Sequence, residues 1–256
     1  MSGGGTWDRF WSSKGDLDEV YPSSPRVLAA VLERLPEGAP RVLEIGAGTG
    51  RDSAALAARG ARAVALDAAP ESLALIARGH PALRGRGIVG GDALHLPFPD
   101  GVFDAVFHQG VLEHFGNPYA FLAENRRVTR PGGILVVDVP QTWHPWTVLK
   151  RAALRVDRWF AGWETDYTME ELESVVRGAG FEVLEEYADT MVPSLAYRLA
   201  REAGRRAGVR LPLRPPAPAA ARRVRAAVRQ RFLETGMARR FAHTIGIVAR
   251  RPAGEP

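Results

Sequence analysis

The sequence predicts an α/β fold, a doubly wound Rossmann-like sheet that is mostly parallel with one antiparallel edge strand. Three observations predict it. Short aliphatic runs alternate with helical patterns through residues 41–139, a glycine-rich turn joins the first run to the first helix, and acidic residues follow three of the runs. Such alternation implies parallel strands joined by right-handed crossovers.

The expected strands and helices follow from the apolar runs and from the proline and glycine residues that bound them. The expected strands are 41–45, 61–67, 86–92, 103–109 and 134–140, and the expected helices are 53–60, 70–79 and 118–130. Pro70 suits a helix start, and Pro131, followed by two glycines, ends the third helix. The continuous apolar run 134–140 is typical of a strand that is buried on both faces.

The chain beyond residue 140 has a different pattern. Residues 168–180 form an amphipathic helical pattern, and 181–189 and 241–250 are the last two expected strands. This pair suits the end of a sheet, with one antiparallel member. Residues 191–240 are expected to be helical, with a proline-rich break at 211–220.

Composition excludes several kinds of site. The chain of 256 residues has no cysteine, which excludes disulfides, thiolate metal ligands and a cysteine nucleophile. Its six histidines are scattered without metal-ligand spacing, so we expect no metal site. No apolar run has the roughly 18 to 20 residues that span a bilayer, and the first ten residues lack the apolar segment of a signal peptide. We therefore expect a cytoplasmic protein.

The positive charge lies mainly in one segment. Residues 191–240 hold 13 arginines and two acids, a net charge of +11, whereas the rest of the chain carries −6. A solvated helical face is one interpretation of this segment, and the binding of an anionic ligand is the other.

The glycine-rich turn has a spacing that matters for its ligand. Gly46, Gly48 and Gly50 form GxGxG, and Arg51 stands where a dinucleotide enzyme with GxGxxG would continue. Glycine between a strand and a helix lets the backbone approach a ligand closely. Glu44, two residues before the turn, would repel a pyrophosphate but suits a ligand that carries an ammonium group.

Two further acids follow the ends of strands. Asp67 ends the second strand and could accept the two hydroxyls of a ribose; the alternative is a helix cap before Pro70. Asp92 follows the third strand and could reach an adenine amino group, or could cap a turn. Ligands of open α/β sheets bind at these strand ends.

These segments together resemble a known family. EIGAGTG, the Asp67 strand end, GGDALHLPFPDGVFDAVFHQGVLEH and RPGGILVVD are similar to the successive motifs of class I S-adenosylmethionine (SAM)-dependent methyltransferases, most of all the branch acting on small molecules, quinones and lipids. The resemblance covers 41–139 closely and 168–189 loosely.

The resemblance implies SAM as cofactor and assigns residues to it. It implies Glu44, Gly46, Ala47, Gly48 and Gly50 at the methionine end, Asp67 and Ala68 at the ribose, Asp92 and Ala93 at the adenine, Gln109 and Gly110 at the methyl-bearing end, and Tyr21 with residues 7–11 in N-terminal helices that close over SAM.

The same resemblance suggests one domain over residues 1–256. Residues 1–40 would form a helical cap, 41–139 the SAM-binding core, and 140–167 and 191–240 insertions on the acceptor side. The tryptophan-rich stretch 143–163 lies in the first insertion and would form a lid, or sit on a membrane interface.

Two histidines are candidate catalytic residues. His108 and His114 flank the end of the fourth strand, near the expected acceptor, where a neutral imidazole could remove a proton from an acceptor hydroxyl. The alternative for both is packing or a hydrogen bond to a loop.

The predicted function is methyl transfer from SAM to an oxygen or nitrogen of a small-molecule, lipid or saccharide acceptor. One alternative is an RNA or DNA methyltransferase that uses 191–240, although Asn117-Pro118-Tyr119 only partly resembles the motif of such enzymes and is displaced towards the next helix. A nicotinamide-dependent oxidoreductase is disfavoured by the glycine spacing and Glu44. A non-catalytic SAM-binding protein is the third alternative.

Overall fold

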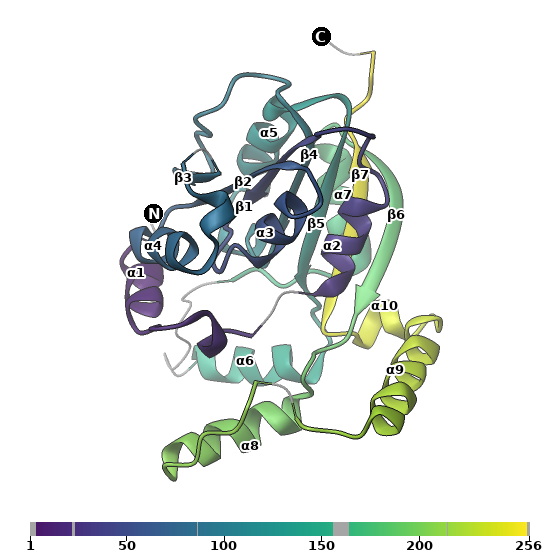
Figure 1. Ribbon diagram of the computed structural model, residues 1–256. Coiled ribbons are helices and arrows are strands. Elements are labelled where there is room, and N and C mark those ends of the chain that lie inside the picture. Colours follow the sequence, from purple (N-terminus) through teal and green to yellow (C-terminus); the bar gives the residue numbers. More distant parts are fainter. Residues whose placement is uncertain (1–3, 22–23, 86, 156–163, 214, 255–256) are drawn as a thin grey trace.

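The computed structural model describes residues 4–21, 24–85, 87–155, 164–213 and 215–254. Seven strands form one sheet in the order β3-β2-β1-β4-β5-β7-β6, with helices on both of its faces (Figure 1). The strands are β1 Arg41–Ile45, β2 Arg62–Asp67, β3 Ile88–Gly90, β4 Phe103–Gln109, β5 Thr129–Pro140, β6 Glu182–Asp189 and β7 Thr244–Arg250.

The helices precede the sheet, connect its strands and extend beyond its carboxyl end. They are α1 Gly4–Ser12, α2 Pro25–Leu32, α3 Arg51–Ala57, α4 Pro70–Gly79, α5 Pro118–Val128, α6 Pro145–Arg155, α7 Met169–Gly178, α8 Leu195–Arg206, α9 Ala219–Leu233 and α10 Ala238–Phe241. Short 3-10 turns lie at Leu17–Glu19, Pro81–Leu83 and Leu112–His114. In the described part of the chain, no helix has both the length and the apolar content to cross a membrane.

The sheet confirms the expected fold class. Strands β1 to β5 pair in parallel, and β7 runs antiparallel to both β5 and β6, with Val248 opposite Val136 on one side and Glu185 on the other. The final pair of strands therefore contains one antiparallel member, as expected. Within that pair β6 forms the edge, and β7 lies one position in.

Alternating strand residues build a core on each face of the sheet. On one face Leu43, Val106 and Leu135 join buried residues of α5 and α7. On the other face Val42 and Val136 join buried residues of α2 and α3. Side chains of a strand alternate between faces, so continuous apolar runs are needed where helices cover both sides.

Several boundaries differ from the sequence prediction. The strand expected over 86–92 is only β3, Ile88–Gly90, and the helix expected over 118–130 ends at Val128. Strand β5 begins at Thr129, so Pro131, Gly132 and Gly133 lie within the strand, near its start. There the register of β4 and β5 shifts between the Phe103 and Ala105 pairs. A shift of this kind admits residues that a regular ladder disfavours.

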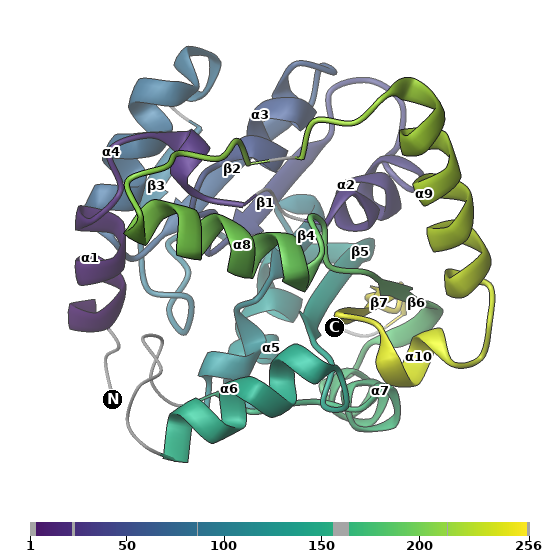
Figure 2. The ribbon, with the colours of Figure 1, turned by 90° about the horizontal axis from the view of Figure 1, so that it is seen from below.

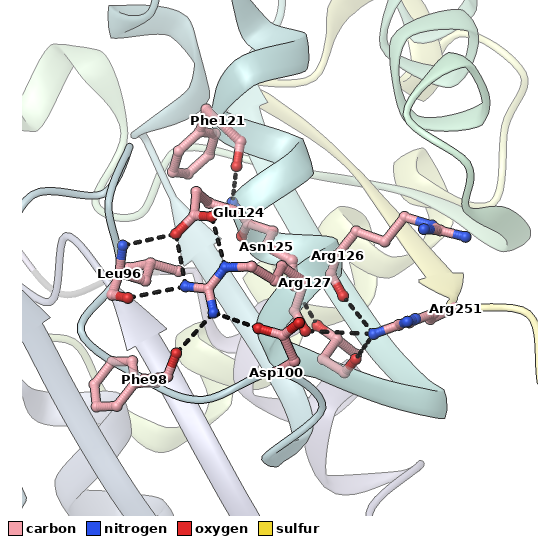
Figure 3. A network of polar contacts seen from close by, with 10 residues as sticks. Leu96, Phe98, Asp100, Phe121, Glu124, Asn125, Arg126, Arg127 and Arg251 are labelled. Carbon is pink, nitrogen blue, oxygen red and sulfur yellow. Dashed lines mark hydrogen bonds and ion pairs between the residues drawn. The ribbon is translucent and has the colours of Figure 1, made fainter. Parts of the chain in front are cut away.

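The amino end of the sheet is closed by arginines (Figure 3). Arg127 of α5 donates to both oxygens of Glu124, to Asp100 and to the carbonyls of Phe98 and Leu96. Arg251 donates to three carbonyl oxygens at the end of α5, those of Arg126, Arg127 and Thr129, at 3.0, 3.3 and 2.7 Å. Cations suit the carboxyl end of a helix, and these contacts join α5 to the sheet.

The opposite end of the sheet, where the parallel strands finish, carries α1, α6 and α8 (Figures 1 and 2). Helices α8 and α9 bury none of their residues fully. The arginine-rich segment 191–240 is thus a pair of surface helices plus α10, rather than part of the core. The tryptophans Trp159 and Trp163 of the predicted lid lie outside the described residues.

Candidate SAM-binding and acceptor site

The glycine turn between β1 and α3 has a left-handed backbone that suits a ligand-binding loop. Gly46, Gly48 and Gly50 have φ of 65°, 54° and 64°. A Cβ atom on Gly46 would come within 2.6 Å of Val111, and one on Gly50 within 2.8 Å of Ile76. Only glycine meets both conditions, positive φ and close approach, without cost.

Asp67 holds this turn at the end of β2. Its Oδ2 accepts the Gly48 N–H at 2.8 Å, and its Oδ1 accepts the Ala69 N–H at 2.9 Å. The side chain of Asp67 is largely buried, whereas the neighbouring Ala68 is exposed. A carboxylate oxygen can accept more than one hydrogen bond, so Asp67 can position the turn and still receive ligand hydroxyls.

Glu44 belongs to β1, and its carboxylate is directed to the first turn of α3 rather than to the glycine turn. Its Oε2 accepts the Ser53 N–H at 2.9 Å and the Ser53 hydroxyl at 2.5 Å. Burial, and then the negative charge of Asp52, raises the pKa of Glu44 to about 8. Glu44 therefore has a structural role at a helix N-terminus, and its predicted contact with an ammonium group stays a prediction. The neighbouring Ala47 is buried and donates its N–H to the Leu66 carbonyl at 3.0 Å.

Asp92 follows β3 in a local turn. It accepts the Leu94 N–H at 2.9 Å and contacts His95 Nδ1 at 3.0 Å, and its side chain is 59% exposed. These hydrogen bonds, first the one from Leu94, lower the pKa of Asp92. The neighbouring Ala93 is half-buried against the core. The turn-capping alternative is thus realised for Asp92, and its contact with adenine stays a prediction.

Gln109 and Gly110, at the end of β4, join three parts of the chain. The Gln109 Oε1 accepts the Ser24 N–H at 2.9 Å, and its Nε2 donates to Asp138 at 3.0 Å. Gly110, with φ of 67°, donates its N–H to the Asp138 carbonyl at 2.9 Å. Both predicted residues thus border the carboxyl ends of β4 and β5, and Gln109 links the N-terminal cap to the sheet.

Sequence reasoning missed the acids behind Gln109. Asp138 is fully buried in β5, and burial, followed by the negative charge of Asp189, raises its pKa to about 8. Asp189, at the end of β6, accepts from the Ser24 hydroxyl and from Arg229 of α9. A lone acid inside the apolar run 134–140 was the available signal for Asp138. Nothing local in the sequence points to its partners, which are distant along the chain.

The two candidate histidines have very different surroundings. His108 in β4 has no exposed surface, and neither ring nitrogen has a hydrogen-bond partner among the described residues. It packs edge-on against Phe121, with ring centroids 4.8 Å apart. His114, in the 3-10 turn after β4, is half-buried and packs edge-on against Trp7 at 5.1 Å. The packing alternative therefore describes His108, while His114 remains the candidate base.

We expect His108→Leu to reduce the sensitivity of the protein to acid. Burial lowers the pKa of His108 to about 3. The unfolded chain binds this proton below its ordinary pKa of about 6.5, so the neutral ring contributes stability above that pH, and the contribution is lost as the pH falls towards 3. Between pH 7 and pH 5 the loss is about 2 kcal/mol.

Urea unfolding at both pH values measures this effect. The parent should lose about 2 kcal/mol more than His108→Leu on going to pH 5. His95→Gln, at a side chain that is 84% exposed, is the control. Equal losses in the parent and in His108→Leu would contradict the prediction.

The N-terminal cap covers the glycine turn. Trp11 of α1 is buried, and a Cβ atom on Gly48 would lie 2.9 Å from its indole. Arg51, the residue after the turn, donates to the carbonyls of Val20 and Leu17, the first at 2.9 Å. The predicted closing of residues 7–11 over the turn thus has a geometric basis in the structure.

Tyr21, also in the N-terminal cap, lies against α8. The guanidinium of Arg198 lies 4.1 Å from the centre of its ring, and that of Arg201 lies 5.4 Å away. The arginine-rich segment therefore contacts a predicted cofactor-binding residue directly.

A buried cluster of three charged side chains lies between α6 and the segment that leads into α7. Lys150 of α6 donates to Glu164 and to Asp166, at 2.6 Å each, and the side chains of all three are at most 7% exposed. Burial alone would lower the pKa of Lys150, but the hydrogen bonds to Asp166 and Glu164 raise it. This cluster joins α6 to the chain that leads into α7.

Comparison with known proteins agrees with this geometry. Residues 43–137 match the family model described as a methyltransferase domain. A demethylmenaquinone methyltransferase from Beutenbergia cavernae is 43% identical over 111 residues, covering 43% of this chain and 45% of the relative. Residues 43–137 are thus similar to the methyltransferase domain of class I SAM-dependent methyltransferases.

Two other proteins match a longer stretch. The biotin biosynthesis bifunctional protein BioHC of Cellvibrio japonicus is 33% identical over 184 residues, covering 68% of this chain and 34% of the relative. The solved structure of the [4+2]-cyclase SpnF is similar with a TM-score of 0.59 at 26% identity, covering 90% of this chain and 82% of the cyclase. The chain spans less than half the length of the two curated relatives.

Proposed function

We propose that the protein binds SAM on the glycine turn and transfers its methyl group to a small-molecule acceptor at the carboxyl ends of β4 and β5. One observation carries the proposal: the Gly48 N–H is fixed by Asp67, so the glycine turn after β1 and the acid after β2 form one unit. Open α/β sheets bind ligands at this edge.

The residues fit the parts of SAM in this proposal. Gly46, Gly48 and Gly50 let the methionine end approach the backbone, and Asp67 receives the ribose hydroxyls. The sulfonium of SAM supplies an electrophilic methyl group with a good leaving group. Gln109 and Gly110 would face that end. The protein then acts mainly by orienting the acceptor, an effect that is worth on the order of 7 to 11 kcal/mol.

The proposed acceptor class is a small molecule that loses a proton on methylation. Curated relatives named demethylmenaquinone methyltransferases support a quinol as the first acceptor to test. His114, half-buried beside Trp7, is the proposed base for its proton. Positioned proton transfer contributes roughly 10²- to 10⁴-fold to a rate.

The structure disfavours the nucleic-acid alternative at one point. Asn117 is the N-cap of α5, and its Oδ1 accepts the N–H groups of Tyr119 and Ala120 at 3.1 and 3.4 Å. The Asn117-Pro118-Tyr119 sequence is thus accounted for by a helix start, as Asn at the N-cap and Pro at the first helical position usually are.

Thermal unfolding with SAM, S-adenosylhomocysteine, NAD and NADP in parallel tests the cofactor. We expect SAM and S-adenosylhomocysteine alone to raise the melting temperature, because a ligand at 100 times its Kd stabilises the folded state by about 2.7 kcal/mol. Turnover is then measured with labelled SAM and a naphthoquinol. His114→Gln should lose about 10²-fold or more in kcat, and His108→Leu serves as the matched control that retains it.

A shift with NAD or NADP alone would contradict SAM binding. SAM binding without turnover on any small-molecule acceptor would favour a non-catalytic SAM-binding protein.

A further inference from the structure

Two arginines of α8 share one aromatic ring at the acceptor end of the molecule. Arg198 and Arg201 are three residues apart, so they project from the same side of the helix. Both guanidinium groups lie against Tyr21, at 4.1 and 5.4 Å from the ring centre. Figure 2 shows α8 crossing the end of the sheet where the parallel strands finish.

Among the described arginines of residues 191–240, these two are half-buried and have no carboxylate partner. Of the other ten, five form ion pairs, and five are unpaired but exposed: Arg210, Arg222, Arg223, Arg225 and Arg240. Arg229 pairs with Asp189, Arg239 with Glu186, and Arg205 and Arg206 with Glu202. The charge of each of these arginines is neutralised by a carboxylate of the same chain.

Arg198 and Arg201 instead contact only neutral oxygens. Arg198 donates to the carbonyls of Pro193 and Val192, both at 3.2 Å, and Arg201 donates to that of Leu211 at 3.1 Å. Among the described residues no carboxylate lies within ion-pair distance of either guanidinium. Both side chains are half-buried. Two half-buried guanidinium groups that lie against the same ring repel each other. An anion that accepts hydrogen bonds from both would offset this repulsion.

Polar groups without partners lie on the neighbouring segments. The buried His243 Nδ1 and the buried hydroxyls of Thr142 and Thr147 have no hydrogen-bond partner among the described residues. The rings of His144 and His243 are 4.9 Å apart. Burial, and also the positive charge of Arg198, lowers the pKa of both histidines, so Arg198 acts electrostatically on this pair.

We propose that Arg198 and Arg201, stacked on Tyr21, bind an anionic group of the methyl acceptor. The group is a carboxylate or a phosphate, since both accept the paired N–H donors of guanidinium. The inference rests on the proposed methyl transfer, and it adds a charged group to the acceptor at a distance from the atom that is methylated. The family match ends at residue 137 and leaves this part of the chain outside it.

The carboxylate of SAM itself is the competing anion. The proposed binding mode has the methionine end of SAM on the glycine turn between β1 and α3. Arg198 and Arg201 belong to α8, which is joined to that region only through Tyr21 in the contacts described above. The geometry therefore assigns the arginine pair to the acceptor.

The test measures anion binding by the full chain saturated with S-adenosylhomocysteine, at pH 7.5 and constant ionic strength in chloride. Inorganic phosphate and benzoate are titrated separately, and the melting temperature is recorded. We expect at least one of them to stabilise the parent. Arg198→Gln/Arg201→Gln should weaken the binding of that anion about 10-fold or more, because it removes the charge-assisted hydrogen bonds of both guanidinium groups. A phosphate effect points to a phosphorylated acceptor and a benzoate effect to a carboxylic acid.

Matched variants separate a site from general charge. Arg222→Gln/Arg223→Gln removes two arginines of α9 whose residues are unburied, and it should leave anion binding unchanged. Arg198→Lys/Arg201→Lys keeps the charge and should retain part of the binding. The proposal is overturned if neither anion stabilises the parent, or if both arginine pairs affect binding equally.

The S-adenosylhomocysteine titration provides an independent result. Weaker binding of it by Arg198→Gln/Arg201→Gln would assign the pair to the cofactor carboxylate and overturn the proposal. If the parent does not bind S-adenosylhomocysteine at all, the proposed methyl transfer fails, and the anion titrations still decide on the arginine site.

Discussion

Gly48→Val is expected to weaken SAM binding by about 100-fold or more, which corresponds to roughly 2.7 kcal/mol. The residue has a φ of 54°, where a side chain costs about 1 to 2 kcal/mol. In addition, a Cβ atom at Gly48 would lie 2.9 Å from the Trp11 indole. Either the turn or the cap must then move, and both border the proposed SAM site.

Asp67→Ala tests the other half of the same unit. Its removal leaves the N–H groups of Gly48 and Ala69 without acceptors and takes away the proposed ribose contact. Unsatisfied buried donors cost about 1 to 3 kcal/mol each. We expect weaker SAM binding together with lower stability.

Isothermal titration calorimetry with SAM measures both variants. Gly60→Val is the matched control, because Gly60 also has a positive φ, of 91°, but a Cβ atom there would meet nothing within 4 Å. It should carry the same type of backbone strain and keep its SAM affinity. Undiminished affinity in both Gly48→Val and Asp67→Ala would refute the site.

Lys150→Met is expected to destabilise the protein by about 3 to 5 kcal/mol, the usual cost of removing one partner from a buried ion pair. The ammonium group is the shared partner of Glu164 and Asp166, and all three side chains are almost fully buried. Methionine matches the length of lysine, so packing is largely kept while Glu164 and Asp166 lose the ammonium group that they share.

The free energy of unfolding in urea measures this cost. Arg151→Met is the control, since Arg151 contacts the same Asp166 at 2.7 Å but its side chain is 39% exposed. Exposed pairs contribute about 0 to 1 kcal/mol. A loss below 1 kcal/mol in Lys150→Met would show that the carboxylates find other partners or take up protons at little cost.

Prediction from sequence was most accurate where local pattern and packing agree. The aliphatic runs that form β1, β2, β4 and β5 are buried on both faces, so their composition alone shows that they are strands. It was least accurate where the backbone is short or irregular, as in β3 and at the start of β5. In these places hydrogen bonding to the neighbouring strand decides which residues pair, and the local sequence pattern does not show it.

The side chains of the site show the same division. Glu44 and Asp92 stand at the expected strand ends, yet Glu44 bonds to Ser53 and Asp92 bonds within its own turn. The position of a residue along the chain determines at which strand end it lies. Hydrogen-bond partners then determine its orientation, and these come from groups that the sequence does not bring together.

The sequence by itself determined the fold class, the resemblance to class I SAM-dependent methyltransferases and the position of the glycine turn, because each rests on spacing within one strand–turn–helix unit or on apolar runs. The tertiary structure decided that His108 is a core residue and His114 is not, and that Gln109 joins Ser24 to Asp138. It also brought Arg198 and Arg201 onto Tyr21, about 180 residues away along the chain. Burial and long-range pairing are properties of the packed chain, and so only folding could specify them.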